Sequence, residues 1–214
     1  MTARVEEPVD YTPLEEKWNI YTHGFVFVVS VVGLIFLCFR ESGNPKTTIS
    51  LIIFGLSMCV LYLASTTYHN SKNLIRRNRL KVFDHAAIYV LIAGTYTPYT
   101  LVTLEGEIGW IIFSISWSIA IFGIILKLFF TGRFDILSTI LYVAMGWIIV
   151  FAYKPLMANL DPAGVTWLFA GGIAYTIGAV LYSIKRIPFN HAIFHVFVLA
   201  GSFCHYISIY FYVQ

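Results

Sequence analysis

Long apolar stretches constrain this chain more than any other feature. A helix that crosses a bilayer needs about 20 mostly apolar residues. Such stretches follow one another with short polar connections, near residues 22–39, 48–69, 83–102, 108–130, 134–153, 166–184 and 191–213. The pattern predicts an all-α, polytopic membrane protein of seven transmembrane helices.

The composition agrees with a lipid environment. Hydrophobic residues make up 58% of the 214 residues and charged residues only 12%, whereas soluble domains carry about 25% charged residues. A soluble domain of this length could not hide so much apolar surface in one core. We therefore divide the chain into a polar lead-in at residues 1–21, which does not resemble a cleaved signal peptide, and a seven-helix membrane domain at residues 22–214.

The positions of the basic residues predict the orientation. Seven spans put the termini on opposite sides, and of the 14 Lys and Arg only Arg40, Lys46 and Lys154 fall on the C-terminal side. The others are Arg4, Lys17, Lys72, Arg76, Arg77, Arg79, Lys81, Lys127, Arg133, Lys185 and Arg186. Because loop Lys and Arg are retained on the cytoplasmic face, the N-terminus is expected inside and the C-terminus outside.

Ionisable residues at membrane depth are expensive and therefore functional candidates. One histidine, His205, lies deep in the last span, whereas the other five and Asp84 fall at the cytoplasmic ends of their spans. Those five are His23, His69, His85, His191 and His195.

Three of these histidines form a candidate metal site. His191 and His195 are four residues apart, which places them one turn apart on one helix face. With His69 they provide three imidazole nitrogens and leave room for a non-protein ligand, which is the pattern of a catalytic zinc site. The alternative is that the histidines cap helices or bond to neighbouring carbonyl groups, as buried polar side chains must.

Two more residues have suitable chemistry beside such a site. A bound Zn²⁺ would lower the pKa of its water toward about 7 and polarise a substrate carbonyl. Asp84 would hold or deprotonate that water, and Ser65, four residues before His69, would orient it or an oxyanion.

Several ordered motifs then carry a resemblance to a known family. They are Glu15-Glu16 with Asn19, Thr22-His23-Gly24, Ser65 to His69, Asp84-His85, Ile92 to Pro98, and His191 to His195. In these motifs the sequence resembles the bacterial hemolysin III-like branch of the progestin and adipoQ receptor family. The resemblance runs almost from end to end of the chain.

The resemblance implies a seven-helix fold with the N-terminus inside, in a bacterial plasma membrane. It implies Zn²⁺ bound by three histidines, which carry over to His69, His191 and His195. The family's aspartate near the zinc-bound water carries over to Asp84, and its serine to Ser65. No departure from the family's pattern is seen at these five positions.

The other three histidines are not predicted to bind the metal ion. Asp84 and His85 are about 100° apart on a helix, so both cannot point at one metal ion, and His85 is read as packing or as support for the site. His23 is a candidate partner beside the site, and His205 is too remote to bind the same ion. Glu15 and Glu16 are read as part of the polar lead-in.

Three functions remain open at this stage. The first is a zinc-dependent intramembrane hydrolase acting on a lipid or another hydrophobic amide or ester. The second is a receptor-like or membrane-homeostasis protein with structural zinc. The third is a pore, although the membrane centre lacks the polar stripe that a conduit normally needs. Membrane lipids and a lipid-like substrate in an intramembrane cavity are the expected partners. Nucleic acid is not expected, and the sequence does not indicate the oligomeric state.

Overall fold

The structure is a computed structural model, which describes residues 11–40, 43–104, 106–131 and 135–214. All regular structure in these ranges is helical. The elements are α1 (Pro13–Phe39), α2 (Pro45–Asn70), α3 (Leu74–Pro98), the π-helix η1 (Tyr99–Leu104), α4 (Gly106–Phe130), α5 (Asp135–Gly146), the 3-10 helix η2 (Ile148–Ala152), α6 (Tyr153–Asn159), α7 (Pro162–Ser183) and α8 (Asn190–Tyr212).

Within the described ranges, 7 helical segments are long and apolar enough to cross a membrane. The predicted fold class is thereby confirmed. Residues 1–10 of the predicted lead-in, residue 134 of the fifth predicted span, and Arg4 and Arg133 of the charge pattern lie outside the described residues.

Three of the long helices begin with a side-chain cap followed by proline. Thr12 accepts from the Glu15 amide at 3.2 Å before α1, and Asn44 and Asp161 cap α2 and α7 in the same way. Proline suits the first helical turn because its missing N–H would have no helical partner there. Helix α1 consequently starts at Pro13, well before the predicted span at residue 22, and its first turns are ordered as part of the bundle.

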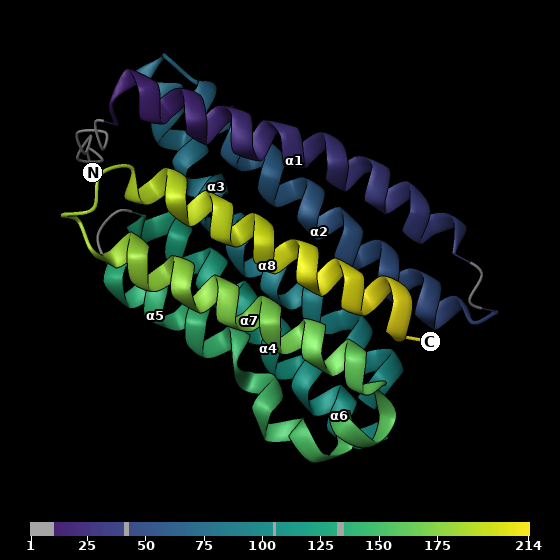
Figure 1. The fold of residues 1–214 in the computed structure, drawn as a ribbon. Helices are drawn as coiled ribbons and strands as arrows, with labels where there is room; N and C mark the ends of the chain where they lie inside the picture. Colours follow the sequence, from purple (N-terminus) through teal and green to yellow (C-terminus); the bar gives the residue numbers. More distant parts are fainter. Residues whose placement is uncertain (1–10, 41–42, 105, 132–134) are drawn as a thin grey trace.

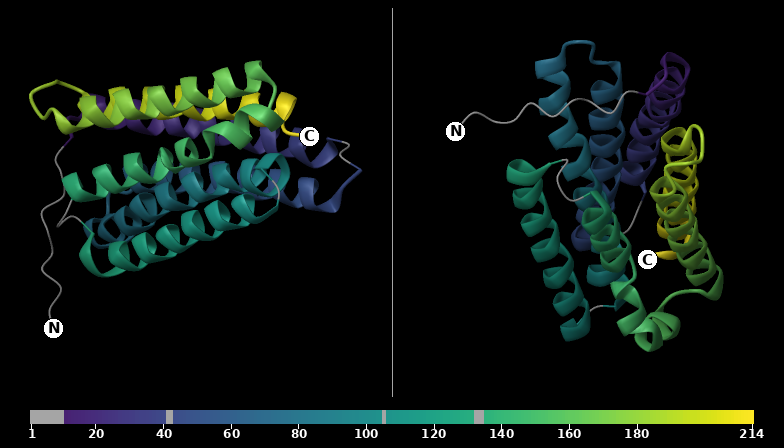
Figure 2. Two further views of the ribbon diagram at one scale, coloured as in Figure 1. Left: turned by 90° about the horizontal axis from the view of Figure 1, so that it is seen from below. Right: turned by 90° about the vertical axis from the view of Figure 1, so that its left-hand side faces the viewer.

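The helices lie side by side along most of their length (Figure 1), in the order α4, α3, α2, α1, α8, α7 by their packing contacts. The hydroxyl of Tyr206 on α8 donates to the Gly33 carbonyl of α1 at 3.0 Å. Helix α5 packs between α3 and α7, and the right-hand view of Figure 2 shows it, in green, in the middle of the bundle. Large apolar side chains such as Phe25, Phe129 and Phe151 remain exposed on the outside, where a membrane protein meets lipid.

The fifth span is interrupted, whereas the sequence predicted one stretch near residues 134–153. Helix α5 ends at Gly146 and a 3-10 turn leads into α6. The hydroxyl of Tyr96 on α3 fits into the break: it lies 3.0 and 2.9 Å from the carbonyls of Met145 and Gly146 and accepts from the Ile149 amide at 2.9 Å. Irregular backbone at membrane depth requires such internal partners because lipid supplies none.

The alternating chain direction brings distant segments to one end of the bundle. The first turns of α1, α3 and α8 and the last turns of α2 lie at the left-hand end of Figure 1. The candidate site residues come from these four helix ends.

Candidate metal centre

The described residues hold one group of three side chains that could bind a metal ion: His69, His191 and His195. One ring nitrogen from each lies within 4.8 Å of the others, and the two Nε2 atoms of His69 and His191 are 3.1 Å apart. The three side chains are only 2%, 7% and 2% exposed. The last turns of α2 and the first turns of α8 supply them.

A carboxylate fixes the orientation of His69. Glu16 Oε2 lies 2.7 Å from His69 Nδ1, and Glu16 also forms an ion pair with Arg77 of α3. Because a carboxylate kept ionised by an arginine only accepts, His69 Nδ1 carries the proton. In the neutral ring, the Nε2 lone pair is then directed at the histidine group, an arrangement common to metal-binding histidines.

A threonine plays a comparable part for His195. The Thr22 hydroxyl donates to the Trp18 carbonyl at 2.7 Å, so its only proton is engaged. His195 Nδ1, at 3.4 Å from the same oxygen, is therefore the donor of that contact. This again leaves Nε2 of the neutral ring as a free acceptor.

Tyr11 covers His191 just ahead of α1. Its ring stacks on the His191 ring with centroids 4.8 Å apart and planes at 28°, and it also contacts His69. Burial raises the pKa of the Tyr11 phenol well above its ordinary value, so this hydroxyl is neutral. A neutral aromatic ring shields this side of the histidine group from solvent.

Asp84 and Ser65 lie at the same place. Both are buried, at 7% and 1% exposure, and both line a cavity together with His191 and His195. The Ser65 hydroxyl interacts with the Asp84 carboxyl, although no hydrogen bond of standard geometry satisfies it among the described residues. Ser65 and Asp84 therefore form one polar pair that faces the cavity.

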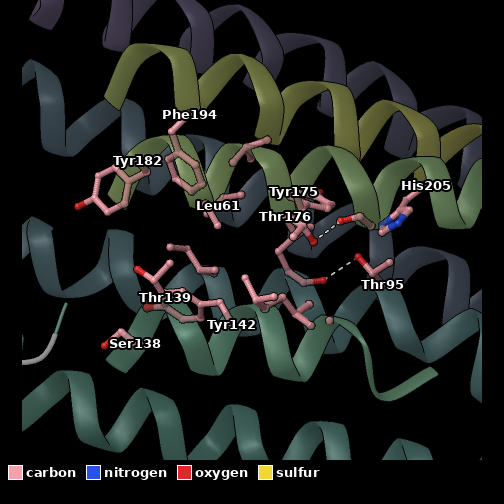
Figure 3. A pocket seen from close by; sticks show the side chains of 18 of the residues that line it. Leu61, Thr95, Ser138, Thr139, Tyr142, Tyr175, Thr176, Tyr182, Phe194 and His205 are labelled. Atoms are coloured by element: carbon pink, nitrogen blue, oxygen red, sulfur yellow. Dashed lines mark hydrogen bonds between the residues drawn. The ribbon is translucent and has the colours of Figure 1, made fainter. Parts of the chain in front are cut away.

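The cavity runs from the histidine group between α3, α5, α7 and α8, and its walls are mostly apolar. Figure 3 shows Tyr182, Phe194, Ser138 and Thr139 toward one end, and Thr95, Thr176 and His205 toward the other. Its volume is about 160 Å³, many times the roughly 10–15 Å³ that one water requires. An apolar space of this size fits a hydrocarbon segment better than a single ordered water.

The other three histidines do not belong to the candidate metal group. His23 stacks on His195 with centroids 3.5 Å apart, and neither of its ring nitrogens has a partner among the described residues. His85 lines the cavity, and its carbonyl accepts from Tyr142. His205 lies deeper and approaches the Leu168 carbonyl at 3.0 Å through Nε2.

The three-histidine group suits a metal ion. A tetrahedral ion bonded at 2.0–2.1 Å to each nitrogen places the ligands roughly 3.4 Å apart, close to the 3.1 Å between His69 and His191. Glu16 and Thr22 occupy the Nδ1 atoms of His69 and His195, which leaves the Nε2 lone pairs of these two rings available to a metal ion. The roles of Asp84 and Ser65 stay predictions.

Sequence reasoning missed the supports of this group. Glu16 was assigned to the polar lead-in, but it lies on α1 and contacts His69 and Arg77. Thr22 and Tyr11 were given no role. The available signal was the helix-start pattern Thr12-Pro13 followed by Glu15 and Glu16, which would have extended the first span back to Glu16 and Thr22.

Comparison with known proteins identifies the family. A sequence model described as haemolysin-III related matches residues 11–206, which is most of the chain. The chain belongs to the haemolysin-III-related family.

Curated relatives agree with this assignment. The chain is 45% identical over 204 residues to a hemolysin-3 homolog of Bacillus subtilis (strain 168), and the match covers 94% of this chain and 96% of the relative. It is 44% identical over 201 residues to hemolysin-3 of Bacillus cereus, covering 93% and 92%. The human monocyte to macrophage differentiation factor is 30% identical over 210 residues, covering 92% and 84%. With seven apolar helices in the part of the chain that the structure describes, this haemolysin-III-related protein is a multi-pass bacterial membrane protein.

Proposed function

We propose that this protein is a zinc-dependent intramembrane hydrolase that acts on a lipid or another hydrophobic amide or ester. One observation carries the proposal: three buried histidines meet at the end of an apolar cavity that Asp84 and Ser65 also line. A three-histidine metal site by itself is compatible with many functions. Because this one lies at the end of a cavity suited to a hydrocarbon chain, it favours chemistry on a hydrophobic substrate.

The donor set favours zinc. Neutral imidazole nitrogens suit Zn²⁺, whereas Mg²⁺ and Ca²⁺ prefer oxygen ligands. Three protein ligands are typical of catalytic zinc sites, which keep a fourth position open for water or substrate, whereas structural sites use four protein ligands. When bound, Zn²⁺ supplies a Lewis acid and lowers the pKa of its water ligand to about 7.

The protein's own residues would do the remaining work. Asp84 would accept the proton of the attacking water, since its buried carboxylate lines the cavity beside the histidine group. The Ser65 hydroxyl would donate to the oxygen of the substrate carbonyl as negative charge develops on it. The apolar walls would hold the hydrocarbon part of the substrate and exclude water.

Metal content is the first test. Detergent-purified wild type should contain about one zinc per chain by elemental mass spectrometry, and His191→Ala and His195→Ala should lose it. His85→Ala is the matched control, because His85 lines the cavity outside the histidine group, and it should keep its zinc. Well-folded wild type without zinc would rule out the proposed mechanism.

Turnover is the second test. Asp84→Asn should keep the fold and the zinc but hydrolyse long-chain amides or esters roughly 10²- to 10⁴-fold more slowly, which is the usual contribution of a general base. Mass spectrometry of the products would follow the reaction.

A structural role for the metal is the second candidate, because the histidines join α2 to α8 across one end of the bundle. In that case chelation lowers the thermal stability sharply, and no hydrolysed product forms from any lipid extract. Unchanged turnover in Asp84→Asn would remove Asp84 from the mechanism without excluding the metal.

A further inference from the structure

A second polar position lies at the deep end of the cavity, away from the histidine group. His205 is on the same helix as His191 and His195, about 21 Å and 15 Å further along at 1.5 Å per residue. It does not belong to the candidate metal group, but it lines the same cavity. Figure 3 shows it on α8 near Tyr175 and Thr176 of α7.

The hydrogen bonding of His205 leaves one acceptor free. Its Nε2 lies 3.0 Å from the Leu168 carbonyl, and a carbonyl only accepts, so Nε2 carries the proton. Nδ1 of the neutral ring is then a lone-pair acceptor. It has no partner among the described residues, although the side chain is only 8% exposed.

Tyr175, Thr95 and Thr176, which lie near His205 in the cavity, are already bonded within the protein. The Tyr175 hydroxyl shares a 2.7 Å hydrogen bond with Ser202. Thr95 donates to the Leu91 carbonyl at 2.8 Å. Thr176 donates to the Gly172 carbonyl and accepts from Trp147. Unlike these three groups, His205 Nδ1 is a buried acceptor without a donor among the described residues.

The His205 ring is also held in place. A Cβ atom at Gly171 would clash with the ring, so the bare backbone of α7 lets the imidazole pack directly against it. Together with the bond to Leu168, this contact fixes the direction of Nδ1. A fixed acceptor loses little conformational freedom when a ligand binds.

We propose that His205 Nδ1 is a second ligand-binding point of the cavity, which accepts a hydrogen bond from a hydroxyl carried on the chain of a hydrophobic substrate. The inference rests on the proposed function, because it places the reacting amide or ester at the histidine group. It narrows the substrate class to long-chain amides or esters with a distal hydroxyl.

The position of that hydroxyl follows from the length of the helix. An extended chain advances about 1.2 Å per covalent bond. The helical separations of His195 and His191 from His205 therefore correspond to about 12 to 17 bonds. Between the two ends, the lining is apolar and includes Ile88, Ile92, Val143 and Val198, which suits a plain hydrocarbon segment.

Binding of matched probes tests the proposal. The probes are an unsubstituted long-chain amide, the same amide with a hydroxyl about 12 to 17 bonds from the carbonyl, and an isomer with the hydroxyl about 4 bonds away. Their Kd values would be measured on detergent-purified protein by displacement of a fluorescent long-chain amide. Because one hydrogen bond contributes a net factor of about 5 to 10, the distal hydroxyl should tighten binding by that factor, and the proximal hydroxyl should not.

A conservative variant separates this role from packing. In His205→Gln, the side-chain amide can still donate to the Leu168 carbonyl at the place of Nε2, but no acceptor remains at the place of Nδ1. The variant should lose the preference for the distal hydroxyl, so that the ratio of the Kd values for the unsubstituted and distal-hydroxyl probes falls to about one.

The outcomes distinguish this inference from the proposed function. Equal Kd values for the distal-hydroxyl and unsubstituted probes on wild type would overturn it, as would a preference that survives in His205→Gln. Absence of binding by every probe would overturn both proposals. A distal-hydroxyl preference that persists in His191→Ala, where metal and turnover are lost, would support the binding point. Absence of turnover in metal-loaded wild type would then count against the hydrolase alone.

Discussion

Glu16 joins two elements at the candidate metal centre, since its carboxylate contacts both His69 of α2 and Arg77 of α3. Replacing Glu16 by Gln removes the negative charge that favours the proton on His69 Nδ1. One of the two former carboxylate positions then carries an N–H₂ group, which cannot accept a hydrogen bond from His69 or from Arg77. Outer partners of this kind usually change metal affinity by 10- to 100-fold. We therefore expect Glu16→Gln to bind zinc roughly 10- to 100-fold more weakly, as measured by competition with a chromogenic chelator.

Glu107→Gln is the control for this prediction. Glu107 is an exposed acidic residue in the first turn of α4, far from the histidine group, and its substitution should leave zinc affinity unchanged. Wild-type affinity in Glu16→Gln would show that His69 is oriented sufficiently without the carboxylate.

Residue spacing predicted the candidate ligands better than their supports. His191 and His195 share a helix face by simple periodicity, and His69 was placed near them because its span ends on the same side. The structure brings the three together. The contact between Glu16 and His69 joins residues 53 positions apart, so it depends on the rotation of α1 against α2. Apolar periodicity in a lipid-facing helix does not fix that rotation, because lipid and neighbouring helices are equally apolar.

At the scale of elements, the interrupted fifth span depends on a donor from another helix. Tyr96 of α3 contacts the backbone at Met145, Gly146 and Ile149 through one hydroxyl. Tyr96→Phe would leave the buried Ile149 amide and a carbonyl without partners, at about 1–3 kcal/mol. We expect a clearly lower melting temperature for the detergent-purified variant. Tyr153→Phe is the control, since Tyr153 is 47% exposed in the same span and its loss should have little effect.

This break also shows where sequence-based prediction of the elements ends. The seven apolar stretches were predicted correctly because a helix in lipid must be both long and apolar. The structure has 7 such helices over its described residues. Gly146 ends α5 and Pro155 follows the 3-10 segment at Ile148–Ala152, but Gly and Pro are also frequent within transmembrane helices, so the sequence alone does not fix the break. Only the partner hydroxyl of Tyr96, from a different span, makes the irregular backbone tolerable at that depth.

At the scale of the whole molecule, the orientation in the membrane remains the prediction to test. The charge pattern places the candidate metal centre toward the cytoplasm, because it lies at the end of the bundle where α1 and α3 begin. A fusion of alkaline phosphatase to Gln214 should be active and a fusion of green fluorescent protein there should be dark, since the C-terminus is expected outside.

An internal junction supplies the opposite signal. Fusions placed after Arg186, in the connection between α7 and α8, should give fluorescent protein and inactive phosphatase, because that connection lies on the basic side. Fluorescence at Gln214 would reverse the orientation and place the histidine group at the outer face. For the proposed function, the result decides whether a metal ion would reach the histidine group from the cytoplasm or from outside the cell.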